Sequence, residues 1–118
     1  MRSGQDVLER AKCLLNYTHT DSEQRALAIV NQIYADIWYT ERREPFLPLR
    51  TLSQPLLLSA RQVQDVMPYG VAMLLALSEG DGDNQQLYAT VYNRKRAAAD
   101  AVRRRCNVLF RRAEEAAE

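Results

Sequence analysis

The stretch MPYGVAMLLALSEGDGD, residues 67–83, decides the fold. Pro68 suits the first position of a helix, where no N–H needs an intrahelical partner. The residues that follow are apolar on almost every side, which is typical of a helix buried at the centre of a domain or between subunits. Gly80 suits a left-handed C-cap, and Asp83 is expected to cap the next helix. The stretch therefore predicts a central buried helix that turns tightly into another helix.

A long C-terminal helix is predicted after this turn, from about residue 84 to residue 112. Half of the 16 Lys and Arg residues lie between positions 94 and 112, against one acid, Asp100. Because this far half carries little apolar bulk, we expect it to project beyond the core or to face a partner, with residues 106–118 projecting or frayed. The predicted apolar seam comprises Leu87, Val91, Ala98, Val102 and Leu109, with Tyr88, Tyr92 and Cys106 beside it.

Two further helices are predicted before the central one. Residues 5–17 carry apolar residues at three- and four-residue spacing, which gathers them on one face. A second helix is predicted from about residues 20–23 to 41–43. A capping box of Thr20 and Glu23 fits its start, with Asp21 or Ser22 as alternative caps. Pro45 disfavours helix at the preceding residue and so limits its end.

Residues 44–60 are predicted to be non-helical, because Pro45, Pro48 and Pro55 exclude a helix there. The segment is too apolar for a free linker. It favours a short β-hairpin or an extended arm, with strands near 46–51 and 56–58 and a turn at Ser53–Gln54. A lone hairpin is marginal in water, so the segment must pack on the helices or on another subunit. Residues 60–67 are expected to form a helical turn.

Length and composition fit one small all-α domain spanning residues 1–118, with a core over about 5–105. The hydrophobic fraction of 47% and the charged fraction of 26% are ordinary globular values. No apolar run approaches the ~20 residues that span a bilayer, and the polar N-terminus lacks the apolar core of a signal peptide. We therefore expect a soluble intracellular protein with no membrane partner. The net charge of +1 predicts no strong overall attraction to nucleic acid.

The sequence predicts no catalytic site, no metal site and no cofactor. His19, the single histidine, stands in a predicted loop with no nearby nucleophile, so a triad has no signature. The acids between 79 and 83 resemble a calcium loop only loosely, because the glycine and the terminal acid of an EF-hand are misplaced. Cys13 and Cys106 lack CxxC partners and are expected to be small buried hydrophobes. We therefore expect a binding or assembly role, not an enzyme.

The arginine-rich stretch allows three interpretations: a nucleic-acid footprint, a protein interface, where Arg is enriched, or a solvated helix face. Arg103, Arg104 and Arg105 fan around the helix, so they do not all point at one ligand. This fan weakens the nucleic-acid interpretation. The candidate partner interface comprises Arg94, Arg96, Arg103, Arg104, Arg105, Leu109, Phe110, Arg111 and Arg112.

Residues 67–83, followed by Tyr88, Tyr92–Asn93 and Lys95–Arg96, resemble the head–tail connector (head-completion or adaptor) proteins of tailed bacteriophages. Those small proteins often pair a P-Y-G-x-A apolar helix with a G-D loop and a long helix containing Y-x-x-x-Y-N-x-x-R/K. The apolar residues of the 48–58 segment resemble the family's hairpin. The resemblance covers about residues 20–105, and the dense arginine run departs from the family pattern.

The resemblance implies a structural virion component of the phage neck, assembled in the host cytoplasm. In that family, copies form a ring beneath the portal protein, link the capsid to the tail or a stopper protein, and continue the DNA channel, with possible non-specific contact with DNA. The long helix tends to reach the portal. The alternatives are another neck or tail-joining protein and a small helical nucleic-acid-binding protein. Candidate inter-subunit residues are Phe46, Leu47, Leu49, Leu52, Leu56 and Leu57.

Overall fold

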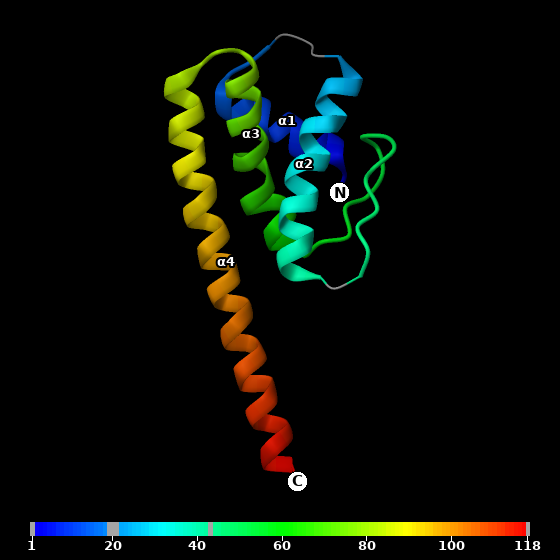
Figure 1. Ribbon diagram of the computed structural model, residues 1–118, viewed down its shortest axis with the longest axis vertical. Helices are drawn as coiled ribbons and strands as arrows, with labels where there is room; N and C mark the ends of the chain where they lie inside the picture. The colour runs from blue at the N-terminus through cyan, green and yellow to red at the C-terminus, as the bar shows by residue number, and fades with distance from the viewer. Residues whose placement is uncertain (1, 19–21, 43, 118) are drawn as a thin grey trace.

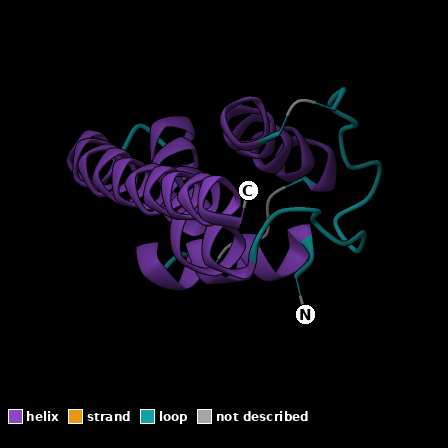
Figure 2. Ribbon diagram, turned by 90° about the horizontal axis from the view of Figure 1, so that it is seen from below, coloured by secondary structure: helices purple, strands orange, loops and turns teal. Residues whose placement is uncertain are grey.

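The computed structural model is an all-α bundle with one long projecting helix (Figures 1 and 2). It describes residues 2–18, 22–42 and 44–117, without the side chains of residues 103 and 106–117. The molecule measures 58 × 30 × 21 Å. The predicted fold class is therefore confirmed. The helices are α1 (Gly4–Leu15), α2 (Glu23–Glu41), the π-helical segment η1 (Gln62–Val66), α3 (Met67–Ser78) and α4 (Gly82–Ala117).

Helix α3 lies at the centre, as its nearly continuous apolar surface predicts. It packs against α1, α2 and α4, and η1 leads directly into it (Figure 1). Pro68 occupies its first turn, and Gly80 follows its end with φ 73°, the left-handed conformation that favours glycine. The predicted helical turn before α3 is η1. The fully buried positions of α3 include Met67, Pro68, Val71, Ala72, Leu75 and Ala76.

The helix starts follow local capping chemistry. Ser3 and Asp6 form a capping box at the start of α1, and the Ser22 hydroxyl caps α2 by accepting from the N–H of Arg25. Two of the alternative α2 caps, Thr20 and Asp21, lie outside the described residues. The predicted cap of α4 is wrong. Asp81 accepts from the N–H of Asn84, so α4 starts one residue before Asp83.

The segment between α2 and η1 is an extended arm, and the predicted strand pair does not form among the described residues. The arm turns at 51–54, as expected, and its hydrogen bonds with itself lie at this turn, within residues 50–54. Outside the turn it bonds to α2 and to the N-terminus. The side-chain amide of Asn31 on α2 makes two hydrogen bonds, of 2.7 and 2.9 Å, with the backbone N–H and carbonyl of Leu49. These bonds take the place of those that a neighbouring strand would make. On the other side, Leu56 N–H donates to Arg2 O, and Ser3 and Pro55 form an isolated bridge.

The buried face of α4 differs from the predicted seam. Leu87 and Val102 are 53% and 37% exposed, whereas Tyr92 and Ala99 are buried. Ala98 is also exposed, so the packed face is turned by about one residue around the helix from the predicted one. The physical reason is that the rings of Tyr88 and Tyr92 pack over α3, so that Leu87 of the predicted seam points outward.

One cysteine also departs from expectation. Cys13 is exposed on α1, because the buried face of this helix is formed by Val7, Leu8, Ala11 and Leu15. The side chain of Cys106 lies outside the described residues.

Candidate interaction surfaces

Polar contacts around Asp36 fix α4 to the bundle at residues 92–96. The Tyr92 hydroxyl donates to Asp36 Oδ2 at 2.8 Å, and the Arg96 guanidinium pairs with the same oxygen and donates to the Asp36 carbonyl. Next to it, Lys95 pairs with Asp65 at 2.8 Å. These contacts tie α4 to α2 and η1 just before the helix leaves the bundle.

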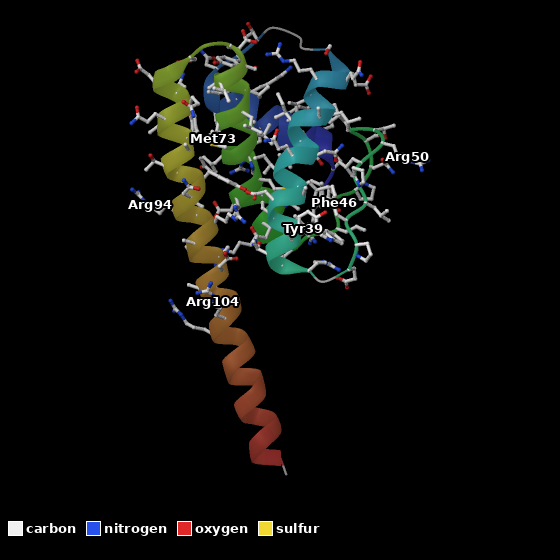
Figure 3. The ribbon with its side chains drawn as sticks, viewed as in Figure 1. Tyr39, Phe46, Arg50, Met73, Arg94 and Arg104 are labelled. Carbon is white, nitrogen blue, oxygen red and sulfur yellow. The ribbon has the colours of Figure 1, made fainter. Side chains whose placement is uncertain are left out.

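The predicted partner interface is therefore only partly available. Arg96 is engaged with Asp36 and belongs to the bundle. Arg94, Arg104 and Arg105 are exposed, and Figure 3 shows Arg94 and Arg104 on the side of α4 away from α2 and α3. The remaining predicted residues have side chains outside the described set: Arg103, Leu109, Phe110, Arg111 and Arg112.

The predicted inter-subunit residues of the arm fall into two groups. Leu49, Leu52 and Leu56 are buried in the core of the same chain, so they stabilise the monomer. Phe46 is half-buried, with its ring 5.2 Å from that of Tyr34. Leu47 and Leu57 are 78% and 58% exposed. Of this set, Leu47 and Leu57 are the leucines whose side chains are exposed.

A groove between α2, α3 and α4 was not foreseen from the sequence. It has a volume of about 360 Å³, and its lining is polar and apolar in about equal parts. Figure 3 shows Met73 of α3 between α2 and α4. Tyr39, which also lines the groove, is 70% exposed. The signal for it was weak, because Met73 and Leu74 lie on a helix that is apolar all round. The lining residues are Gln32, Ile33, Ala35, Asp36, Tyr39, Met73, Leu74 and Tyr92.

The acidic α3–α4 turn has a structural use. Asp81 accepts hydrogen bonds from the Asn84 side chain, the Asn84 N–H and the Tyr17 hydroxyl, which hold the pKa of Asp81 below its ordinary value. Within the described residues, no group of three or more His, Cys, Asp or Glu side chains has a metal-binding arrangement. No helix in this described part is both long and apolar enough to cross a membrane. His19 lies outside it.

Tyr92 gives the bundle a predicted sensitivity to alkaline pH. Burial, together with the bond to Asp36, raises the pKa of Tyr92 well above the ordinary value of about 10. Above pH ~10 the unfolded chain loses the phenol proton while the folded chain keeps it, so stability falls as the pH rises. We expect a shallower fall in Tyr92→Phe, measured by urea unfolding between about pH 7 and 11.

The matched control for this pH measurement is Tyr39→Phe, which removes a hydroxyl from an exposed ring. It is expected to keep the wild-type slope. Because burial also raises the pKa of Tyr17, some slope remains in Tyr92→Phe. Equal slopes in the wild type and Tyr92→Phe would contradict the prediction.

Comparison with protein-family models, with curated proteins and with solved structures found no match to this chain.

Proposed function

We propose that this protein is a structural virion component, a head–tail adaptor that forms a ring beneath the portal, links capsid to tail and continues the DNA channel. The observation that carries this proposal is α4, a 36-residue helix whose C-terminal half extends beyond every other element (Figure 1). Within the described part of the chain, no other helix therefore lies beside the last residues of α4. The proposed role is binding and assembly, not catalysis.

The contacts at residues 92–96 give α4 a fixed direction relative to the bundle, which supports a docking role for its projecting end. The Asp36 contacts with Tyr92 and Arg96 fix its direction relative to α2, and Lys95 fixes it to η1. At 1.5 Å per residue, residues 103–117 are roughly 22 Å long, and the end of the helix lies roughly 30 Å beyond Arg96. An anchored helix of that reach presents its end at a defined place, which suits docking on a larger complex.

The spacing of apolar positions indicates that a partner covers this projecting part. On the bundle, α4 packs through Tyr88, Tyr92 and Ala99, at the three- and four-residue spacing of a helical seam. The sequence continues that spacing at Cys106, Leu109 and Ala113. The exposed Arg104 and Arg105 stand beside this continuation, and arginine is enriched at protein interfaces. A seam that continues past its own bundle is expected to pack on another protein.

Docking tests the proposal with two matched double variants. We expect Arg104→Gln/Arg105→Gln to weaken co-sedimentation with the portal complex of the same genome by roughly tenfold or more, because interface arginines are common hot spots. The control, Arg10→Gln/Arg50→Gln, removes the same charge from exposed positions on α1 and the arm. It is expected to dock like the wild type. Both variants should keep the wild-type unfolding midpoint.

A chain that ends at Val102 sharpens this test. It retains Tyr92, Lys95 and Arg96 and should fold, but it should not dock. Full docking by this shortened chain would contradict the proposal. Self-association without portal binding would favour another neck or tail-joining protein. DNA binding that weakens steeply with salt, without portal docking, would favour the nucleic-acid-binding alternative.

A further inference from the structure

A small hollow lies where α4 leaves the bundle. It has a volume of about 140 Å³ and is lined from three parts of the chain. Glu41 is the last residue of α2, and Gln62 is the first of η1. Ala99 and Val102 form the wall contributed by α4, and Ser59 and Arg61 complete the lining. The hollow therefore lies between α2, the start of η1 and α4, at the point where α4 leaves the bundle.

Two oxygens in this lining lack a hydrogen-bond partner among the described residues. They are Glu41 Oε2 and Gln62 Oε1, and both atoms are shielded from solvent. Gln62 as a whole is only 5% exposed. Arg61 lines the same hollow, yet it donates to neither oxygen. Since buried polar groups are nearly always paired, two unpaired acceptors in one hollow indicate a donor that binds there.

The chemistry of the lining defines that donor. An ionised carboxylate and an amide oxygen only accept hydrogen bonds, so the complementary group is rich in N–H and carries positive charge. A guanidinium fits best, because its planar fork donates to two acceptors at once. The volume equals the share of roughly four or five water molecules in the liquid, which is enough for the head of one side chain.

We infer that this hollow is a socket for an arginine supplied by a second copy of the chain. Arg94 and Arg105 lie roughly three turns apart on α4, hence on one face. Both are exposed. That face is rotated by roughly 130° from the buried Ala99, at 100° per residue, so these arginines point away from their own bundle.

A socket on one side and arginines on the other give each copy two different, complementary patches. Contacts of this kind run head to tail, and they close into a ring when the rotation from one copy to the next is a whole fraction of a turn. The inference rests on the ring assembly contained in the proposed function. It assigns to that assembly a contact between Glu41 and Gln62 of one copy and the outer face of α4 of the next.

Charge exchange tests this contact, with the self-association constant measured by sedimentation across a range of concentrations. Glu41→Lys and Arg105→Glu are each expected to weaken association by roughly 30-fold or more, because each leaves one charge unpaired at a desolvated contact. The double variant Glu41→Lys/Arg105→Glu places a lysine in the socket and a glutamate on α4. It is expected to recover most of the association.

Glu9→Lys, which makes the same charge change at an exposed position of α1, is the control and should associate like the wild type. Association unaffected by Glu41→Lys, or a protein that stays monomeric at every concentration and on the portal, would overturn the inference. It would also be overturned if Glu41→Gln and Arg61→Gln lowered the thermal midpoint of the monomer non-additively, because the donor would then come from the same chain. Association that depends on Glu41 without portal docking would contradict only the proposed function.

Discussion

Replacing Tyr34 with alanine is expected to lower the free energy of unfolding by about 3–5 kcal/mol. Tyr34 is a residue of α2, it is 2% exposed, and its ring faces the arm. Its ring packs edge-on against Trp38 at 5.8 Å and Phe46 at 5.2 Å between centroids. Its hydroxyl accepts from the N–H of Leu57 at 3.1 Å. The alanine variant loses a large buried ring and both of its contacts with the arm, the ring contact with Phe46 and the hydrogen bond from Leu57. Urea unfolding followed by circular dichroism would measure the loss of stability.

Two control variants separate the ring of Tyr34 from its hydroxyl. Tyr34→Phe keeps the packing and removes one hydrogen bond, so it should cost only about 1 kcal/mol. Tyr39→Ala removes a ring that is 70% exposed, and it should cost less than Tyr34→Ala. If Tyr34→Ala were no more damaging than Tyr34→Phe, the packing of the arm on α2 would not be the source of the stability.

The elements that local signals specify could be predicted from the sequence. The central helix is identified by Pro68, an apolar run and Gly80, and these act within one segment of the chain. The same holds for the start of α2, where Ser22 provides the cap. The all-α class follows from such signals and does not require knowledge of how the helices pack.

The arm shows where this local information ends. Its sequence suits strands, but its hydrogen-bond partners are side chains of α2, a separate element. The two bonds between Asn31 and Leu49 join residues 18 positions apart, and the bond from Leu57 to Tyr34 spans 23 positions. Nothing in the sequence around Asn31 and Tyr34 indicates that their side chains bond to the backbone of the arm in place of a second strand.

The face of α4 was misplaced for a related reason. A pattern of hydrophobic residues favours Leu87 and Val102 as buried positions, yet Lys95 packs on the bundle because its ammonium group lies 4.9 Å from the Tyr69 ring centre and pairs with Asp65. The charged residue thus belongs to the packed face. Arg96 behaves similarly through Asp36. Both were grouped with the basic segment in the sequence, where partner-facing and bundle-facing residues cannot be told apart.

The socket could not have been found from the sequence at all. Glu41, Gln62 and Val102 come from three elements, and each residue alone reads as an ordinary helix position. Only the fold brings the two unpaired oxygens together. The clustering of basic residues along α4 can in contrast be seen in the sequence, because it is a run of like charges along the chain.

The second large effect is expected at Gly70, near the start of α3. A Cβ atom built there would lie 2.8 Å from Cε2 of Tyr92 and 3.0 Å from two carbons of Ile33. Glycine thus permits the close approach of α3 to α2 and α4. Gly70→Val is expected to destabilise the protein by about 3 kcal/mol, through forced overpacking. Gly82→Ala is the control, because no atom lies within 4 Å of its added Cβ and a helical alanine is favoured.

The clash at Gly70 is expected to be severe because the Tyr92 ring has little freedom to move. It is 3% exposed, and its hydroxyl is held by Asp36 on α2. If this ring is the obstacle, the cost of Gly70→Val should fall by at least about 1 kcal/mol in a Tyr92→Leu background, since residues in contact couple. A double-mutant cycle by urea unfolding measures the difference. The same cost in both backgrounds would assign the clash to Ile33 and would leave the α3–α4 distance independent of Tyr92.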